Sequence, residues 1–213
     1  MKGISLIVAG KGILTVTSTV FVVDDDPLIH SWLSSLFKSA GIQTRPYDSG
    51  HKFIRDYKSD HPGCILLDLK MPGISGLEIQ KILQERENTT PIIFLTGTAN
   101  VESAVEALKK GAFDFLEKPL ERDLLLACIN KALDHDIRTR YEGLQKSQAT
   151  QKFSLLTNRE QEVLRWLIDG KPNKIIANLL NISIRTVEVH RKNIMQKMAA
   201  GSLAGLIKMT LEV

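Results

Sequence analysis

Residues 20–26 read Val-Phe-Val-Val-Asp-Asp-Asp, a short apolar run that ends in three consecutive carboxylates. Residues 64–68, Cys-Ile-Leu-Leu-Asp, repeat this pattern with a single carboxylate. Continuous apolar runs of this length are typical of strands buried on both faces of a parallel sheet. The acidic residues then follow the carboxyl ends of two such strands, which is the edge where open α/β sheets bind their ligands.

Strand and helix patterns alternate on both sides of these two runs, from residue 19 to residue 134. The predicted strands are Val20–Val23, Ile42–Tyr47, Cys64–Leu67, Ile92–Thr96 and Phe113–Leu116. The predicted helices are Pro27–Ala40, Gly50–Lys58, Gly76–Glu87, Val101–Lys110 and Glu121–Asp134. Pro27 suits a first helical turn, and Gly41 and Gly111 suit helix C-caps. This order predicts a doubly wound α/β domain, a (βα)5 parallel sheet covered by helices.

A second domain of four helices is predicted over residues 153–213. Thr157 and Glu160 form a capping box ahead of the first helix, and Ser183 is a predicted N-cap. The other predicted helices are Asn173–Leu180, Ile184–Met198 and Ser202–Leu211. Its predicted core consists of Val163, Leu164, Trp166, Leu167, Ile176, Leu179, Val187 and Ile194. The polar residues 135–152 are expected to be a linker or an extension of the preceding helix.

Charge is distributed unevenly between the two predicted domains. Residues 19–134 carry 13 Lys and Arg against 17 Asp and Glu, whereas residues 152–213 carry 10 against 5. An acidic module joined to a basic one fits a sensor attached to a polyanion-binding domain, although solvated surfaces alone also produce such charges.

Other features of the sequence indicate a cytoplasmic protein without a membrane anchor. No stretch approaches the roughly 18 apolar residues of a membrane span. Cys64 and Cys128 lie in apolar patterns and are expected to be buried free thiols. Residues 1–18 contain Lys11 within an apolar run, which disfavours a secretion signal. We expect these residues to form a disordered extension.

Chemically active residues follow the predicted strands. Asp24 and Asp25 follow the first, Asp68 the third, Thr96 ends the fourth and Lys118 follows the fifth. Because the ends of parallel strands share one edge, these residues are expected to converge. Clustered carboxylates need a cation, and oxygen ligands favour Mg²⁺. Asp68 is then a candidate nucleophile toward phosphorus.

These positions resemble the response-regulator receiver domain. The resemblance rests on Val22-Val23-Asp24-Asp25, Leu67-Asp68-Leu69-Lys70-Met71-Pro72-Gly73, Leu95-Thr96-Gly97 and Glu117-Lys118-Pro119. It implies that Asp68 accepts the phosphoryl group. It also implies Mg²⁺ bound by Asp24, Asp25, Asp68 and the backbone carbonyl of Lys70. Thr96 and Lys118 would contact the phosphoryl group, and Phe115 would be an aromatic switch or a plain core residue.

The acidic residues also allow three other interpretations: a helix cap, a hydrolase site and a degenerate receiver. Asp26 fits a helix cap better than a metal ligand. Aspartyl-phosphate hydrolases also use a nucleophilic Asp after a strand, but they need a second Asp two residues later, where this chain has Lys70. A degenerate receiver that takes no phosphate is disfavoured because all the key residues are present.

The C-terminal domain resembles the LuxR-type helix-turn-helix. The resemblance rests on Leu156–Glu160, Ile182–Arg191 and Lys197-Met198, and with the receiver it places the chain in the NarL/FixJ subfamily. It implies that Glu188, Val189 and Lys192 face DNA bases. The implied backbone contacts are Lys174, Ser183, Arg185, Thr186 and Arg191, while His190 packs or touches phosphate. Ile175 and Gly201 depart from the family pattern.

Together the two resemblances imply a two-component response regulator. A partner histidine kinase would phosphorylate Asp68, and the face formed by about residues 101–115 would change shape and dimerise. The homodimer would bind double-stranded promoter DNA. It would regulate transcription by RNA polymerase, with activation as the expected direction. The chain would not be an enzyme, apart from slow self-dephosphorylation. The alternatives are a regulator that binds DNA independently of phosphorylation and a pure phosphotransfer protein.

Overall fold

The computed structural model describes residues 4–7, 13–16, 18–97, 105 and 107–211. The chain forms two compact units, Met1–Arg140 and Tyr141–Val213. Within the described ranges, no helix has both the length and the apolar character needed to cross a membrane.

The first unit is built on a five-stranded parallel sheet. Its strands are β3 (Thr19–Val23), β4 (Gln43–Tyr47), β5 (Gly63–Asp68), β6 (Ile92–Thr96) and β7 (Asp114–Glu117). Their order is β4-β3-β5-β6-β7, so the chain reverses its direction of winding between the adjacent strands β3 and β5. The predicted doubly wound sheet is therefore confirmed, and its ligand-binding edge lies at this switch point.

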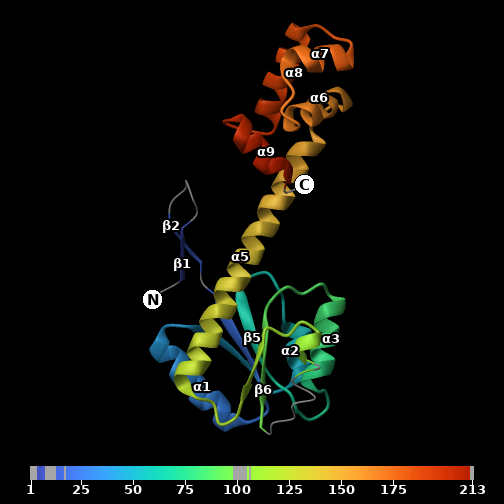
Figure 1. The fold of residues 1–213 in the computed structure, drawn as a ribbon. Coiled ribbons are helices and arrows are strands. Elements are labelled where there is room, and N and C mark those ends of the chain that lie inside the picture. Colours follow the sequence, from blue (N-terminus) through green and yellow to red (C-terminus); the bar gives the residue numbers. More distant parts are fainter. Residues whose placement is uncertain (1–3, 8–12, 17, 98–104, 106, 212–213) are drawn as a thin grey trace. The chain divides into compact units, whose positions relative to one another are not determined.

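Helices cover both faces of the sheet (Figure 1). The helices of this unit are α1 (Pro27–Ala40), α2 (Gly50–Asp56), α3 (Gly76–Glu85) and the first part of α5 (Arg122–Ser154). Alternate residues of β3 point to opposite sides: Val20 and Val22 pack with α1 and α5, whereas Phe21 and Val23 pack with α2 and α3. Burial on both faces explains why the central strands are apolar throughout.

The helix ends follow the predicted capping chemistry. Asp26 caps α1, where its carboxylate accepts a hydrogen bond from the Leu28 amide at 2.8 Å, and Pro27 occupies the first turn. Gly41 ends this helix in the left-handed conformation that glycine tolerates, with φ of 71°. Half of the predicted helix Val101–Lys110 lies outside the described residues, and its described residues 105 and 107–109 are helical.

The N-terminal extension contains a hairpin where the sequence predicts disorder. Strands β1 (Ile4–Ile7) and β2 (Ile13–Val16) pair antiparallel, with Ile4 opposite Val16. Both strands are rich in β-branched residues, which favour extended backbone.

Helix α5 continues without a break through the predicted linker to Ser154. Its residues Asp136 and Ile137 are buried, so the first unit extends beyond the predicted end at residue 134. Asp136 accepts hydrogen bonds from the Gly63 amide at 2.8 Å and from Arg140 Nε at 2.7 Å. The Arg140 guanidinium also reaches Ser59 and Thr90, before the amino ends of β5 and β6. We call Asp136, Arg140, Ser59 and Thr90 the amino-edge cluster.

The second unit contains the end of α5 and the predicted helices. They are α6 (Asn158–Ile168), α7 (Asn173–Leu180), α8 (Ile184–Lys197) and α9 (Leu203–Leu211). The capping box of Thr157 and Glu160 and the Ser183 cap are present as predicted. The predicted core is buried or partly buried except for Leu179, which is 52% exposed. That assignment was wrong because the side chain of Leu179 lies on the outer face of the short helix α7.

Candidate functional site

The acidic residues converge where β3 and β5 end side by side. Val23 pairs with Leu67, so the next residue of each strand, Asp24 and Asp68, continues the same register. Carboxylate oxygens of Asp24, Asp25 and Asp68 all lie within 4.8 Å of one another. Lys118, which follows β7, completes what we call the carboxyl-edge cluster: Asp24, Asp25, Asp68 and Lys118.

Lys118 bridges two of the three carboxylates. Its Nζ lies 2.7 Å from Asp24 Oδ2 and 3.3 Å from Asp68 Oδ1. Burial opposes the charge of this ammonium, but its hydrogen bond to Asp24 and the charge of Asp68 outweigh burial and raise the pKa of Lys118. Burial raises the pKa of Asp68, and the charges of Asp24 and Asp25 raise it further, while Lys118 opposes them. One ammonium therefore balances only part of the negative charge of three carboxylates.

A glycine allows the next helix to begin close to Asp68. A Cβ on Gly76 would lie 2.4 Å from the backbone oxygen of Asp68 and 2.9 Å from the Phe94 ring. The Gly76 amide donates to the Leu69 carbonyl at 3.0 Å, and Ser75 and Glu78 form a capping box at the start of α3. The hydrogen bond between Gly76 and Leu69 closes the loop after Asp68, which contains Lys70.

The donor set of this cluster fits a hard divalent cation. Mg²⁺ prefers oxygen ligands and binds through one or two carboxylates while retaining water. Asp24 and Asp68 are buried, whereas Asp25 is exposed and its carboxylate has no partner among the described residues. The cluster thus has surplus negative charge and one carboxylate open to solvent, as a cation bound from water requires.

The remaining predicted residues lie around this cluster. Thr96 is buried at the end of β6, and its carbonyl accepts from the Lys118 amide at 2.7 Å. The side chain of Lys70 is exposed, so only its backbone remains a candidate ligand. Phe115, on β7, is 39% exposed.

His30 also contacts this cluster, although it was not among the predicted site residues. Its Nε2 lies 2.6 Å from the backbone oxygen of Asp24, and its Nδ1 is buried without a partner among the described residues. The sequence signal for this contact is the spacing of four residues between Asp26 and His30. Residues four apart lie on the same face of a helix, so His30 lies on the face of α1 next to the end of β3.

A second candidate surface in the helical unit is the exposed side of α8 together with Lys174 at the start of α7. Lys174, Arg185, Glu188, Val189 and Lys192 are all exposed, and Val189 is 52% exposed. Asn181, with φ of 52°, makes the tight turn between α7 and α8. These helix lengths and this turn match a helix-turn-helix, whose second helix enters the major groove.

Other predicted DNA contacts also make hydrogen bonds within the domain. Ser183 and Thr186 hydroxyls bond to each other at 2.8 Å in the cap of α8. Arg191 donates to Asn173 at 2.7 Å, which joins α8 to the start of α7. His190 is partly buried, and its Nδ1 has no partner among the described residues. The hydrogen bonds of Ser183, Thr186 and Arg191 stabilise the motif, whereas the five exposed residues named above are free to contact a ligand.

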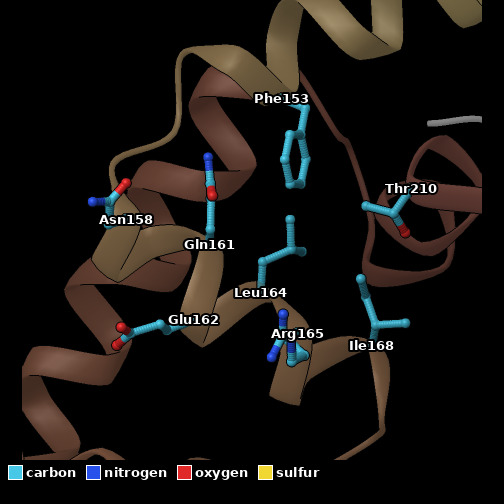
Figure 2. A pocket seen from close by; sticks show the side chains of 8 residues that line it. All are labelled: Phe153, Asn158, Gln161, Glu162, Leu164, Arg165, Ile168 and Thr210. Atoms are coloured by element: carbon cyan, nitrogen blue, oxygen red, sulfur yellow. The ribbon is translucent and has the colours of Figure 1, made fainter.

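A hollow of about 660 Å³ in the helical unit has different chemistry (Figure 2). Phe153 points toward Leu164 across it, and Thr210 lies on the opposite wall. Its one carboxylate, Glu162, is already paired with Arg159 at 2.5 Å. It brings together no group of carboxylates or nucleophiles comparable with the carboxyl-edge cluster.

Comparison with known proteins assigns each unit to a family. The family described as "Response regulator receiver domain" matches residues 20–130. The family described as "Bacterial regulatory proteins, luxR family" matches residues 154–210. Together these matches cover the carboxyl-edge cluster and the four helices α6 to α9.

Full-length relatives share both units. The transcriptional regulatory protein FixJ of Azorhizobium caulinodans is 40% identical over 192 residues, covering 90% of this chain and 91% of its own. The response regulator TodT of Pseudomonas putida is 38% identical over 193 residues, covering 91% and 85%. The solved structure of response regulator StyR is 40% identical, with a TM-score of 0.83 over 92% of this chain and all of its own. The chain therefore belongs to the two-component response regulators of the NarL/FixJ subfamily, with a receiver domain and a LuxR-type DNA-binding domain.

Proposed function

We propose that a partner histidine kinase phosphorylates this regulator on Asp68, and that the phosphorylated chain dimerises and binds promoter DNA. The observation that carries the proposal is the convergence of three carboxylates within 4.8 Å, with Lys118 bridging Asp24 and Asp68. Asp24, Asp25, Asp68 and the Lys70 carbonyl would hold Mg²⁺, which supplies positive charge to the phosphoryl oxygens when bound.

The residues of this chain then have distinct tasks. A carboxylate oxygen of Asp68 attacks the phosphorus of a phosphohistidine; the P–O bond forms, the P–N bond breaks and its electron pair stays on the imidazole nitrogen. Lys118 offsets charge on the phosphoryl group, and the Thr96 hydroxyl donates a hydrogen bond to it. The Phe115 ring turns inward as Thr96 moves.

Dimerisation links this site to DNA. Part of the face formed by about residues 101–115 lies outside the described residues, but Val105, Leu108 and Phe115 are exposed apolar side chains on it. Burial of these side chains against a second copy would pair two helix-turn-helix motifs on a two-fold-symmetric promoter site. On that site Glu188, Val189 and Lys192 would read bases, and bound dimers would recruit RNA polymerase and activate transcription.

A phosphoryl mimic tests this proposal. Wild type with Mg²⁺ and beryllofluoride is expected to sediment as a dimer and to bind selected genomic fragments at least about tenfold more tightly than without the mimic. Asp68→Asn should not respond, because it lacks the attacking carboxylate. Lys192→Glu should still dimerise but lose DNA binding. If wild type binds the fragments equally well without the mimic, the chain is instead a regulator that binds DNA independently of phosphorylation.

A further inference from the structure

Asp24 is held by hydrogen bonds on every side. Its amide donates to the Tyr47 carbonyl at 3.1 Å, and its two carboxylate oxygens accept from the Asp26 amide at 2.9 Å and from Lys118 at 2.7 Å. Its backbone oxygen is 2.6 Å from His30 Nε2. Because Asp24 is fully buried and all of its polar groups are engaged, it is a fixed point of the cluster.

The contact from His30 has a defined direction. A backbone carbonyl only accepts hydrogen bonds, so Nε2 of the imidazole must carry the proton and donate it. The other ring nitrogen is buried and has no partner among the described residues. The bond from Nε2 to the Asp24 carbonyl is therefore the one side-chain hydrogen bond of His30 among the described residues, and it is kept although the unpaired Nδ1 costs stability.

The carbonyl that His30 holds belongs to the peptide bond between Asp24 and Asp25. A peptide unit is planar, so fixing its oxygen also fixes the direction in which the chain continues to the Cα of Asp25. Asp25 is the exposed carboxylate of the cluster and lacks a partner among the described residues. The side chain of His30 therefore restrains the candidate ligand that has no restraint of its own.

We infer that His30 is a positioning residue that sets the direction of the Asp25 carboxylate toward the cation through the Asp24 carbonyl. This inference rests on the proposed function, since it assigns His30 to the Mg²⁺ site proposed there. Groups behind the metal ligands commonly act in this way, and their loss weakens metal binding by roughly 10- to 100-fold.

Three substitutions separate positioning from packing. His30→Phe keeps a planar ring but removes the donor, and His30→Gln restores an N–H donor on a flexible side chain. Ser31→Ala is the matched control, because Ser31 also donates to a backbone oxygen of α1, that of Pro27 at 2.9 Å, without touching Asp24. If His30→Phe does not fold, His30→Leu replaces it with a smaller apolar side chain.

The measurement is the dissociation constant of Mg²⁺ by calorimetry, together with the unfolding temperature in EDTA and in excess Mg²⁺. His30→Phe should weaken Mg²⁺ binding by about tenfold and reduce the rise in unfolding temperature on adding Mg²⁺. His30→Gln should stay near wild type, as should Ser31→Ala. If His30→Phe lowers the unfolding temperature in EDTA but binds Mg²⁺ with the wild-type constant, His30 has only a structural role and the inference is overturned.

The same experiment distinguishes a failure of this inference from a failure of the proposed Mg²⁺ site on which it rests. Asp25→Asn should lose most Mg²⁺ affinity whatever the role of His30. If wild type and Asp25→Asn both fail to bind Mg²⁺, the proposed metal site fails and the inference fails with it. If Asp25→Asn loses Mg²⁺ affinity while His30→Phe binds Mg²⁺ as wild type does, the metal site stands and the inference alone is rejected.

Discussion

The two edges of the five-stranded sheet both bury carboxylates, but they balance them differently. At the amino edge, the one buried carboxylate of Asp136 has a guanidinium and a backbone amide as partners. At the carboxyl edge, three carboxylates share one ammonium. Paired charge is typical of a structural contact, whereas surplus charge of one sign leaves a site that a ligand must complete.

Removing the cation of the amino-edge cluster should have the largest effect on stability. Arg140→Met leaves the Asp136 carboxylate buried with only the Gly63 amide as a partner. We expect the free energy of unfolding to fall by about 3 kcal/mol, the lower end for a broken buried pair because Arg140 is partly exposed. Urea unfolding would be followed in a Trp166→Phe background, where Trp32 is the remaining tryptophan of the chain.

Arg138→Met is the control for this variant, because Arg138 is an exposed arginine of the same helix. It should change the free energy of unfolding by less than about 0.5 kcal/mol. Mg²⁺ affinity should remain unchanged in both variants, since the cluster lies at the opposite edge of the sheet. Equal stability of Arg138→Met and Arg140→Met would contradict a structural role for the amino-edge cluster.

Removing a charge from the carboxyl edge should change the free energy of unfolding in the opposite direction. In EDTA, Asp68→Asn relieves repulsion from Asp24 and Asp25 and spares the cost of burying a charge, so stability should rise by about 1 kcal/mol. Excess Mg²⁺ should stabilise wild type more than the variant. Urea unfolding of both proteins with and without Mg²⁺ checks these two expectations. If Asp68→Asn is less stable than wild type in EDTA, the ion pair with Lys118 outweighs the repulsion between the carboxylates.

A buried ion pair in the helical unit should give the smallest effect and resemble the amino edge. Burial alone would raise the pKa of Glu160, but hydrogen bonds from Lys197 and Thr157 outweigh it and lower that pKa. A lowered acid pKa stabilises the fold above the unfolded value of about 4.3, and this stability is lost as pH falls through the folded pKa.

Glu160→Gln should therefore lose about 0.5 kcal/mol near neutral pH, a value reduced by the partial exposure of Lys197. Its deficit relative to wild type should shrink as the pH falls below the ordinary range of a glutamate, because wild type loses this stabilisation as Glu160 becomes protonated. Unfolding followed by Trp166 in a Trp32→Phe background measures this dependence. A deficit that stays constant down to pH 3 would show that the carboxylate charge of Glu160 is not what stabilises the helical unit.

Most of the fold and the carboxyl edge could be predicted from sequence because their signals are local. Apolar runs, caps such as Asp26 and Ser183, and acidic residues after strands all depend on neighbours within a few positions. The parallel sheet then requires Asp24 and Asp68 to meet, since Val23 and Leu67 are in register.

Only the tertiary structure determines the contacts of residues whose partners lie far away in the sequence. Asp136 and Arg140 had the polar pattern of a linker until Gly63, Ser59 and Thr90 came within hydrogen-bonding distance. Leu179 had the pattern of a core residue, but its burial depends on whether another helix packs over that face of α7. His30 needed the strand end beside α1 before its contact with Asp24 existed. In each case a side chain contacts its partner only when distant segments of the chain pack together. The local sequence pattern therefore does not predict which partner that is.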